Sequence, residues 1–351
     1  MARNSVKRVG KGSTAGAGRD GPVRWGVIST ARIGTEKVIP GMMKSKDVEI
    51  RAIASRTLPT ARKAARKLGI PVAYGSYEEL FNDPDIEAVY NPLPNHLHVP
   101  LTLQAAAKGK HVLCEKPVAM NALEAEQLRG APADVIIAEA FMVRHHPQWI
   151  MARDLARKGR LGTVRAVQVL FSYNLLDPNN IRNMAEIGGG AAYDIGCYAI
   201  ISGRHIFGAE PLRVVSLIDR DPNFGTDRTT SALIDFGDGR HLTFTTSTQA
   251  TPYQRVHILG TKARLEIEIP FNAPQGGSMK LYLDNGSQYA GAAAKTIRLP
   301  KADQYQLQGE AFSRAVRGRQ KMAWGVEDAI LQMRVIDALF RSEKSGAWEK
   351  P

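Results

Sequence analysis

The sequence predicts two folded units, a doubly wound parallel α/β sheet followed by an α+β unit whose open sheet is mainly antiparallel. From Pro22 to about residue 146, short apolar runs alternate with helical stretches, and polar residues follow several of the runs. This alternation is typical of βαβ units in a parallel sheet. Beyond residue 160, strand-like segments follow one another with short connections, which favours antiparallel pairing. We therefore expect units over residues 23–146 and 147–351, with the last helices able to pack back on the first unit.

Charge and hydropathy narrow the class of protein. The chain has 47 Lys and Arg against 34 Asp and Glu, a formal net charge of +13. Residues 1–22 contain five basic side chains and one acidic one among many small residues, so we expect a flexible basic arm there. The charge is compatible with a polyanionic partner, but no recognisable nucleic-acid-binding motif is present, and we expect no nucleic acid. No apolar run approaches the roughly 18 residues of a membrane span, which predicts a soluble protein with no membrane partner.

Only two cysteines are present, Cys114 and Cys197. They lie far apart in the sequence and show neither the spacing of a zinc site nor that of a redox pair. We therefore expect reduced thiols, a cytoplasmic protein and no metal in the site.

The first expected strand, Val23–Ile28, is followed by a turn of small residues before a helix through Met43. This is the position of a dinucleotide-binding turn, although a full G-x-G-x-x-G motif would place glycines at 29, 31 and 34, and the first two are Ser29 and Ala31. Small side chains still allow a pyrophosphate to approach backbone N–H groups at a helix N-terminus. The expected cofactor contacts here are Ser29, Thr30, Ala31, Arg32 and Ile33.

The second expected strand, Val48–Ala54, ends about 20 residues after this turn. An acidic residue there would bind a free ribose 2′-hydroxyl, whereas hydroxyls and a cation suit a 2′-phosphate. The chain has Ser55 and Arg56 and no carboxylate. We therefore expect NADP as the cofactor, with NAD less favoured.

The chain then repeats the strand and helix unit. Helices are expected over Leu58–Leu68 and Tyr77–Phe81, and a strand over Ile86–Tyr90. The loop that follows contains two prolines that restrict its path and could face the cofactor; its candidate residues are Pro92, Leu93, Pro94, Asn95 and His98. A helix to Lys108 then leads to the next strand.

The stretch His111–Pro117 is an apolar strand that ends in Glu115 and Lys116. Pro117 cannot donate to a sheet ladder and biases Lys116 toward an extended backbone. Because ligands bind at the carboxyl edge of an open α/β sheet, this strand end is a candidate site. A helix over 122–129 and a strand over 134–138 complete the first unit.

In the second unit we expect strands over residues 163–174, 212–220, 229–236, 241–249, 254–269, 280–283 and 295–299, and helices over 304–316 and 326–342. Three glycines, Gly188 to Gly190, precede a further helix on which Asp194 and Tyr198 are four residues apart and so share a face. An ammonium beside a tyrosine favours the phenolate, so we expect Lys116 to lower the pKa of Tyr198.

Four motifs therefore occur in order: the Ser29 to Gly34 turn, Pro94-Asn95-x-x-His98, Glu115-Lys116-Pro117, and the Gly188 to Tyr198 segment. In this order and spacing they resemble the Gfo/Idh/MocA family of oxidoreductases, over about residues 23–345. The resemblance implies an N-terminal Rossmann domain, a C-terminal domain whose open sheet often forms the subunit interface, and Lys116 at the nicotinamide and the substrate.

Tyr198 occupies a position where many members of that family have histidine. Together with the segment Glu139–Pro147, it looks most like the branch that contains glucose-fructose oxidoreductase, NADP-dependent xylose dehydrogenases and dimeric dihydrodiol dehydrogenases. This resemblance adds Glu115 and Arg144 to the expected cofactor contacts. It also implies a homo-oligomer, a dimer or a tetramer.

The sequence thus predicts hydride transfer between a sugar carbon and C4 of NADP, such as oxidation of a xylose-like or glucose-like aldose at C1 to a lactone. Tyr198 would be the general acid or base, Lys116 would orient the substrate oxygen, and Asp194 would hold substrate hydroxyls or the lysine. The alternatives are a glucose-fructose oxidoreductase with tightly held NADP, a dihydrodiol dehydrogenase, an anhydro-keto-sugar reductase, or a cofactor-binding regulator without catalysis.

Overall fold

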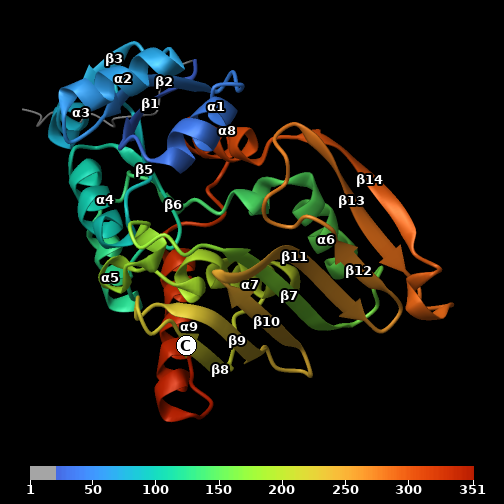
Figure 1. Ribbon diagram of the computed structural model, residues 1–351. Coiled ribbons are helices and arrows are strands. Elements are labelled where there is room, and N and C mark those ends of the chain that lie inside the picture. The colour runs from blue at the N-terminus through green and yellow to red at the C-terminus, as the bar shows by residue number, and fades with distance from the viewer. Residues whose placement is uncertain (1–20) are drawn as a thin grey trace, which may run out of the picture.

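The structure is a computed structural model that describes residues 21–351 and contains two sheets side by side (Figure 1). Of the basic arm expected over residues 1–22, only Gly21 and Pro22 are described, and the rest lies outside the described residues. Within the described part of the chain, no helix is long and apolar enough to cross a membrane.

The first sheet has six strands, all parallel, in the order β3-β2-β1-β4-β5-β6. Its strands are β1 (Val23–Ile28), β2 (Val48–Ala54), β3 (Val72–Tyr74), β4 (Ala88–Asn91), β5 (His111–Cys114) and β6 (Ile137–Glu139). This is the strand order of a Rossmann fold, in which the chain reverses direction across the sheet between β1 and β4. Central strands such as β4 are wholly buried, as a parallel sheet covered on both faces requires. The doubly wound fold expected from the sequence is confirmed.

Helices cover this sheet: α1 (Ile39–Met42), α2 (Leu58–Leu68), α3 (Tyr77–Asn82), α4 (His98–Ala107) and α5 (Ala122–Glu126). The bounds of α2 agree with the expectation. Leu58–Leu68 begins with a proline in its first turn and ends at a glycine with left-handed torsions, the two signals that start and stop a helix.

The second sheet has eight strands in the order β14-β13-β12-β11-β7-β10-β9-β8. Only β7 and β10 pair in parallel and the other neighbours are antiparallel, so the sheet is mainly antiparallel as expected. The strands are β7 (Val164–Asn174), β8 (Arg213–Arg220), β9 (Asp227–Asp235), β10 (His241–Ser247), β11 (Gln249–Gly260), β12 (Arg264–Ile267), β13 (Gly277–Asp284) and β14 (Lys295–Ala302).

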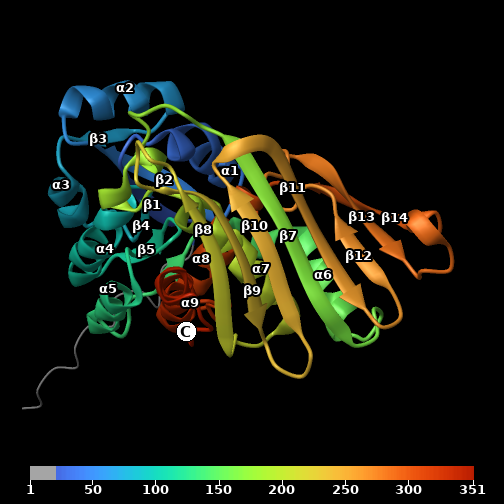
Figure 2. The same cartoon turned by 60° about the horizontal axis from the view of Figure 1, so that its bottom comes forward.

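One face of this sheet is covered and the other is open (Figure 2). Helices α6 (Pro147–Arg157) and α7 (Cys197–Phe207) pack on the covered face. Along β7 and β11, Leu170 and Leu259 are exposed by 41% and 52% and alternate with buried neighbours such as Val169 and Ile258. The open face therefore carries apolar side chains. An oligomer formed through this face stays a prediction.

Two features of the second unit differ from expectation. The strand expected over residues 254–269 is instead a hairpin of β11 and β12, because the chain turns at Gly260, where the backbone packs so closely on the Leu161 carbonyl that no side chain would fit. Helix α6 was not predicted. Its local signals are His146, whose side chain accepts a hydrogen bond from the backbone N–H of Gln148, and Pro147 in the first turn.

The last two helices, α8 (Gln304–Val316) and α9 (Val326–Ser345), pack back on the first unit. The indole N–H of Trp25 in β1 donates to Ser313 Oγ in α8 at 3.1 Å, and both side chains are buried. Asp337 in α9 accepts a hydrogen bond from the backbone N–H of Ala122, at the start of α5. The C-terminal segment thus joins the two units.

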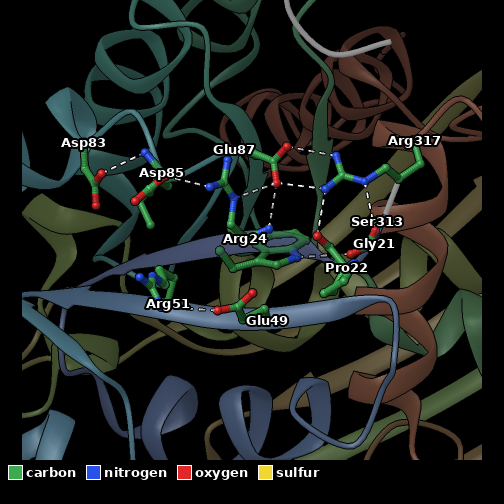
Figure 3. A network of polar contacts seen from close by, with 12 residues as sticks. Gly21, Pro22, Arg24, Glu49, Arg51, Asp83, Asp85, Glu87, Ser313 and Arg317 are labelled. Atoms are coloured by element: carbon green, nitrogen blue, oxygen red, sulfur yellow. Dashed lines mark hydrogen bonds and ion pairs between the residues drawn. The ribbon is translucent and has the colours of Figure 1, made fainter. Parts of the chain in front are cut away.

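An ion-pair network extends this attachment at the amino edge of the parallel sheet (Figure 3). The carboxylate of Glu87, just before β4, accepts hydrogen bonds from the guanidinium of Arg317 at 2.8 and 3.0 Å and from that of Arg24 at 3.3 Å. Arg317 follows α8 and also donates to the carbonyl oxygens of Gly21 and Pro22. Burial opposes ionisation of Glu87, but the two arginines outweigh it and hold its pKa below the ordinary value.

We expect Glu87→Gln to lower the free energy of unfolding by about 2 to 4 kcal/mol at neutral pH, because it leaves the nearly buried Arg317 without its carboxylate. The stabilisation exists above the unfolded-state pKa, near 4.5, and is lost as the pH falls through the lower folded-state value. Denaturant unfolding of both proteins from neutral to acidic pH should therefore show the difference shrinking in acid. Glu49→Gln is the control, because Glu49 and Arg51 are 3.6 Å apart and both about 40% exposed. Equal loss in both variants would contradict this role of Glu87.

Candidate active site

The carboxyl ends of the parallel strands bring most of the predicted site residues to one edge of the sheet. Ser29 follows β1, Ser55 follows β2, Pro92 follows β4 and Glu115 follows β5. This edge, at the reversal between β1 and β4, is where ligands bind in doubly wound folds. The second unit contributes Asp194 and Tyr198 to the same place, as the contacts below show.

In the turn after β1, Ser29 adopts a backbone conformation that is usually found at glycine. Ser29 has a φ of 108°, in the left-handed region that side chains rarely adopt. Its N–H donates to the Ala54 carbonyl of β2, and its hydroxyl accepts a hydrogen bond from the N–H of Ala31 at 3.0 Å. A helix begins at Arg32, and its first N–H groups have no intrahelical partners. Strained residues of this kind cluster at ligand sites, and the exposed helix start suits a pyrophosphate.

The residues that would distinguish the two nicotinamide cofactors lie beside this turn. Ser55 is buried, and its N–H donates to the Tyr74 carbonyl of β3. The Arg56 side chain is exposed, and no ion pair or side-chain hydrogen bond within residues 21–351 includes it. Arg32 is also exposed, by 87%, and pairs with Glu36 one turn along the helix.

The loop after β4 contacts the second unit. The side-chain amide of Asn95 donates to the Gly188 carbonyl at 2.8 Å. His98 is placed differently from the expectation of a cofactor contact: it is buried, and its ring nitrogens lie 2.7 and 2.6 Å from the carbonyl oxygens of Pro117 and Leu93. His98 thus holds the loop against the end of the Lys116 strand, and a direct cofactor contact for it stays a prediction.

Lys116 is the centre of the site. Its ammonium donates to the main-chain carbonyl of Asp194 at 2.7 Å and to the Asp194 carboxylate at 3.2 Å. Only 11% of its side chain is exposed. Burial opposes the charge, but the Asp194 carboxylate outweighs it and keeps the pKa of Lys116 above the ordinary value. The lysine is therefore a fixed cation at neutral pH.

Asp194 holds three groups at once. Besides Lys116, its carboxylate accepts hydrogen bonds from the Tyr173 hydroxyl at 2.6 Å and from the Nε of Arg182 at 2.9 Å. It lies on a π-helical turn, Ala192–Gly196, that leads into α7; such turns are frequent at functional sites. Although burial raises the pKa of Asp194, Arg182 and Lys116 hold it well below the usual range.

Tyr198 lies against Lys116, but its pKa departs from the expectation. The lysine ammonium is 5.0 Å from the centroid of the tyrosine ring, whereas the hydroxyl contacts the Met142 sulfur at 3.3 Å. Burial, with the negative charge of Glu115, raises the pKa of Tyr198 well above its ordinary value. The expected lowering by Lys116 is therefore wrong for this structure, because the ammonium faces the ring and is committed to Asp194.

Two further predicted contacts, Glu115 and Arg144, are engaged within the protein. Glu115 accepts a hydrogen bond from the Tyr90 hydroxyl at 2.6 Å, and burial raises its pKa. Arg144 is buried and binds the Asp328 carboxylate of α9 through both Nη atoms. The structure thus gives Arg144 a role in anchoring α9, and its cofactor contact stays a prediction.

Sequence reasoning missed Tyr173 and Arg182. Tyr173 lies near the end of β7, and its inward position follows from the alternation of that strand with buried Val169 and Phe171. Arg182 lies in the long connection between β7 and α7, where no periodic pattern exists. Its only local signal is Asn180, whose side chain accepts a hydrogen bond from the backbone N–H of Arg182.

Within residues 21–351, no group of three or more His, Cys, Asp or Glu side chains is arranged to hold a metal ion. The groups available for chemistry are the buried Lys116 cation, the Asp194 carboxylate paired with it, and the Tyr198 phenol. That set can bind and polarise an oxygen at the carboxyl edge of the sheet and exchange a proton with it.

Gly188 allows the two units to approach closely. Its φ is +87°, and a Cβ there would lie 2.7 Å from the Asn95 amide nitrogen and 2.8 Å from the Met120 sulfur. We expect Gly188→Ala to cost about 2 kcal/mol of stability, from backbone strain and from displacement of the Asn95 amide, which loses its hydrogen bond to the Gly188 carbonyl. Gly276→Ala is the matched control, with φ +70° and open space around the added Cβ, and should cost only about 1 kcal/mol. Thermal unfolding measures both, and equal losses would show that the close approach does not matter.

Comparisons with known proteins place this site in a family. The model of the NAD-binding Rossmann fold of the Gfo/Idh/MocA oxidoreductase family matches residues 23–132, and the model of a Gfo/Idh/MocA C-terminal domain matches residues 149–266. An uncharacterized oxidoreductase of Rhizobium meliloti is 47% identical over 93% of this chain and 98% of its own length. The D-xylose 1-dehydrogenase (NADP(+)) 2 of Haloferax volcanii is 36% identical over 92% and 98%.

A solved structure agrees. The 3-ketoreductase from Actinomadura kijaniata, in complex with NADP and TDP-benzene, superposes with a TM-score of 0.85 at 28% identity, covering 92% of this chain and 98% of that one. The family expected from the four motifs is thus confirmed. With both halves matched by family models and the relatives aligned over nearly all of it, this chain belongs to the Gfo/Idh/MocA family of NAD(P)-dependent sugar oxidoreductases.

Proposed function

We propose that this protein is an NADP-dependent sugar dehydrogenase that oxidises an aldose at C1 to a lactone. The observation that carries the proposal is Lys116, a buried cation held by Asp194 at the carboxyl edge of the Rossmann sheet, beside the ring of Tyr198. The NADP-dependent D-xylose dehydrogenase, 36% identical over almost the whole chain, supports this substrate class.

The residues divide the work as follows. Lys116 binds the reacting oxygen and stabilises negative charge that develops on it. Tyr198 exchanges the proton of that oxygen. Burial keeps its hydroxyl protonated, the form that donates to a carbonyl in reduction; in the proposed oxidation, the phenol first releases its proton to solvent and then accepts the proton of the substrate hydroxyl. Asp194 keeps Lys116 charged and in place. When bound, NADP accepts or supplies the hydride.

The chain's cofactor edge fits NADP. The strained turn at Ser29 and the helix start at Arg32 present N–H groups suited to a pyrophosphate. After β2 the chain reads Ser55-Arg56-Thr57, without an acidic residue. The Ser55 hydroxyl and the exposed Arg56 suit a ribose 2′-phosphate more than a free hydroxyl. The candidate contacts of the Pro92–His98 loop, Glu115 and Arg144 remain part of the proposal.

Two other substrates are outcomes of the same test. Trans-1,2-dihydrobenzene-1,2-diol dehydrogenase of Mus musculus is 32% identical over 70% of this chain, and a dTDP-3,4-didehydro-2,6-dideoxy-glucose 3-reductase of Streptomyces violaceoruber is 32% identical over 84%. A dihydrodiol or a keto-sugar therefore belongs in the panel. A cofactor that stays bound through gel filtration would instead favour transfer between two sugars, as in a glucose-fructose oxidoreductase.

We expect purified protein to reduce NADP+ with an aldose, measured by absorbance at 340 nm, and Lys116→Ala to lower kcat/KM by about 10²- to 10⁴-fold. Lys108→Ala, at an exposed lysine near the end of α4, is the control and should be unchanged. If only diols or only keto-sugars are turned over, that class would replace aldoses as the proposed substrate. Activity that survives the Lys116→Ala substitution would refute the catalytic role of Lys116. A protein that binds the cofactor but turns over no substrate would favour a cofactor-binding regulator without catalysis.

For the cofactor, we expect Arg56→Ala to raise the KM for NADP+ roughly tenfold and to leave that for NAD+ nearly unchanged, because a charge-assisted hydrogen bond to the 2′-phosphate is lost. Arg66→Ala, an exposed arginine at the far end of α2, should alter neither constant. Initial rates with both cofactors decide the matter. A parallel increase for NAD+ would mean that Arg56 does not contact the 2′-phosphate.

A further inference from the structure

Arg182 is placed at the site with most of its donors unused. Its Nε donates to Asp194, which fixes the orientation of the guanidinium, and 40% of the side chain is exposed. Among the hydrogen bonds and ion pairs of residues 21–351, neither of its Nη atoms has a partner. An arginine held through Nε keeps its two Nη atoms available to a further ligand.

The backbone of Arg182 is locked in place. Its N–H donates to the Asn180 side chain, and its carbonyl accepts a hydrogen bond from the N–H of Gly190. A Cβ at Gly189 would lie only 2.6 Å from that carbonyl, so the Arg182 segment and the glycines pack in direct contact. The backbone of Arg182 is therefore held in place, and its side chain is oriented by the bond from Nε to Asp194.

The Asp194 carboxylate serves two cations. Lys116 and Arg182 share the single carboxylate of Asp194, whose other hydrogen bond comes from the neutral Tyr173 hydroxyl. The Glu115 carboxylate accepts a hydrogen bond from the Tyr90 hydroxyl, and its charge also acts on Lys116 and Arg182. By contrast Arg255, which lines a cavity together with Tyr173, is paired with Glu266. The two Nη atoms of Arg182 are nevertheless charged donors without a protein partner within residues 21–351, and such donors suit an anionic ligand.

We propose that Arg182 recognises an oxyanion on the substrate, so that the preferred substrate is an aldose that carries a carboxylate or a phosphate group. The inference rests on the proposed function and names its substrate class. Both cations touch Asp194, so a sugar whose reacting oxygen meets Lys116 brings a group a few carbons away to the free edge of Arg182. The fork of a guanidinium matches a carboxylate or phosphate through two parallel hydrogen bonds.

The test compares matched substrates with NADP+ at saturation: D-glucose with D-glucuronate, and D-glucose with D-glucose 6-phosphate. We expect kcat/KM for the anionic member to exceed that of its neutral partner roughly tenfold to hundredfold, as one charge-assisted contact would give. Arg182→Met should abolish this preference, so kcat/KM for the anionic member should fall roughly tenfold to hundredfold more than kcat/KM for its neutral partner. The pair that shows the preference distinguishes a carboxylate from a phosphate.

Arg255→Met is the control and should keep the preference, since Arg255 is already paired. A neutral sugar preferred by the unmodified protein, or equal losses for both members in Arg182→Met, would overturn the inference and leave Arg182 only a positioning role for Asp194. Turnover of neutral sugars that requires Lys116 would leave the proposed function standing in that case. If neither member turns over, calorimetric titration of the anionic sugars decides: binding lost in Arg182→Met supports the inference, and absent or unchanged binding refutes it.

Discussion

The site depends on one buried carboxylate, that of Asp194. It joins Lys116 from the end of a strand in the first unit to Tyr173 and Arg182 from the second. Without it, two cations would face each other where little water screens them, which costs several kcal/mol. With it, the lysine stays charged and oriented, and the interface between the units becomes a place where an oxygen can be bound and polarised.

The backbone around Asp194 is shaped for that contact. Gly188 lets the second unit approach the Asn95 loop closely. Within the second unit, Gly189 packs against the Arg182 carbonyl and Gly190 against the Asp227 side chain, where an added Cβ would collide. The π-helical turn then carries Asp194 and leads directly into α7, where Tyr198 packs under the lysine. The π-helical turn thus allows Asp194 and Tyr198 to lie on the same lysine, a placement that depends on this break in regular α-helical geometry.

Stability and chemistry lie at opposite edges of the parallel sheet. The Glu87, Arg24 and Arg317 network fastens the amino edge, and helices α8 and α9 run back from the second unit to the first. The carboxyl edge is left to strained or half-buried groups such as Ser29 and Lys116. Because the amino edge is rigidly attached, the carboxyl edge can hold a strained backbone and a buried charge, each of which would lower the stability of the fold if it were not supported.

The class of fold and the positions of most helices and strands could be predicted from local signals, and so could several candidate groups, because strand ends followed by Ser29, Ser55 and Glu115-Lys116 are recognisable in a parallel sheet. How those groups contact one another could not be predicted, because it depends on packing. The hairpin turn at Gly260, the burial of His98 and Arg144, and the place of Tyr173 and Arg182 on Asp194 depend on contacts between distant segments. The direction of the Tyr198 pKa was decided in the same way, because burial and the orientation of Lys116 over the ring are properties of packing and not of spacing along the chain.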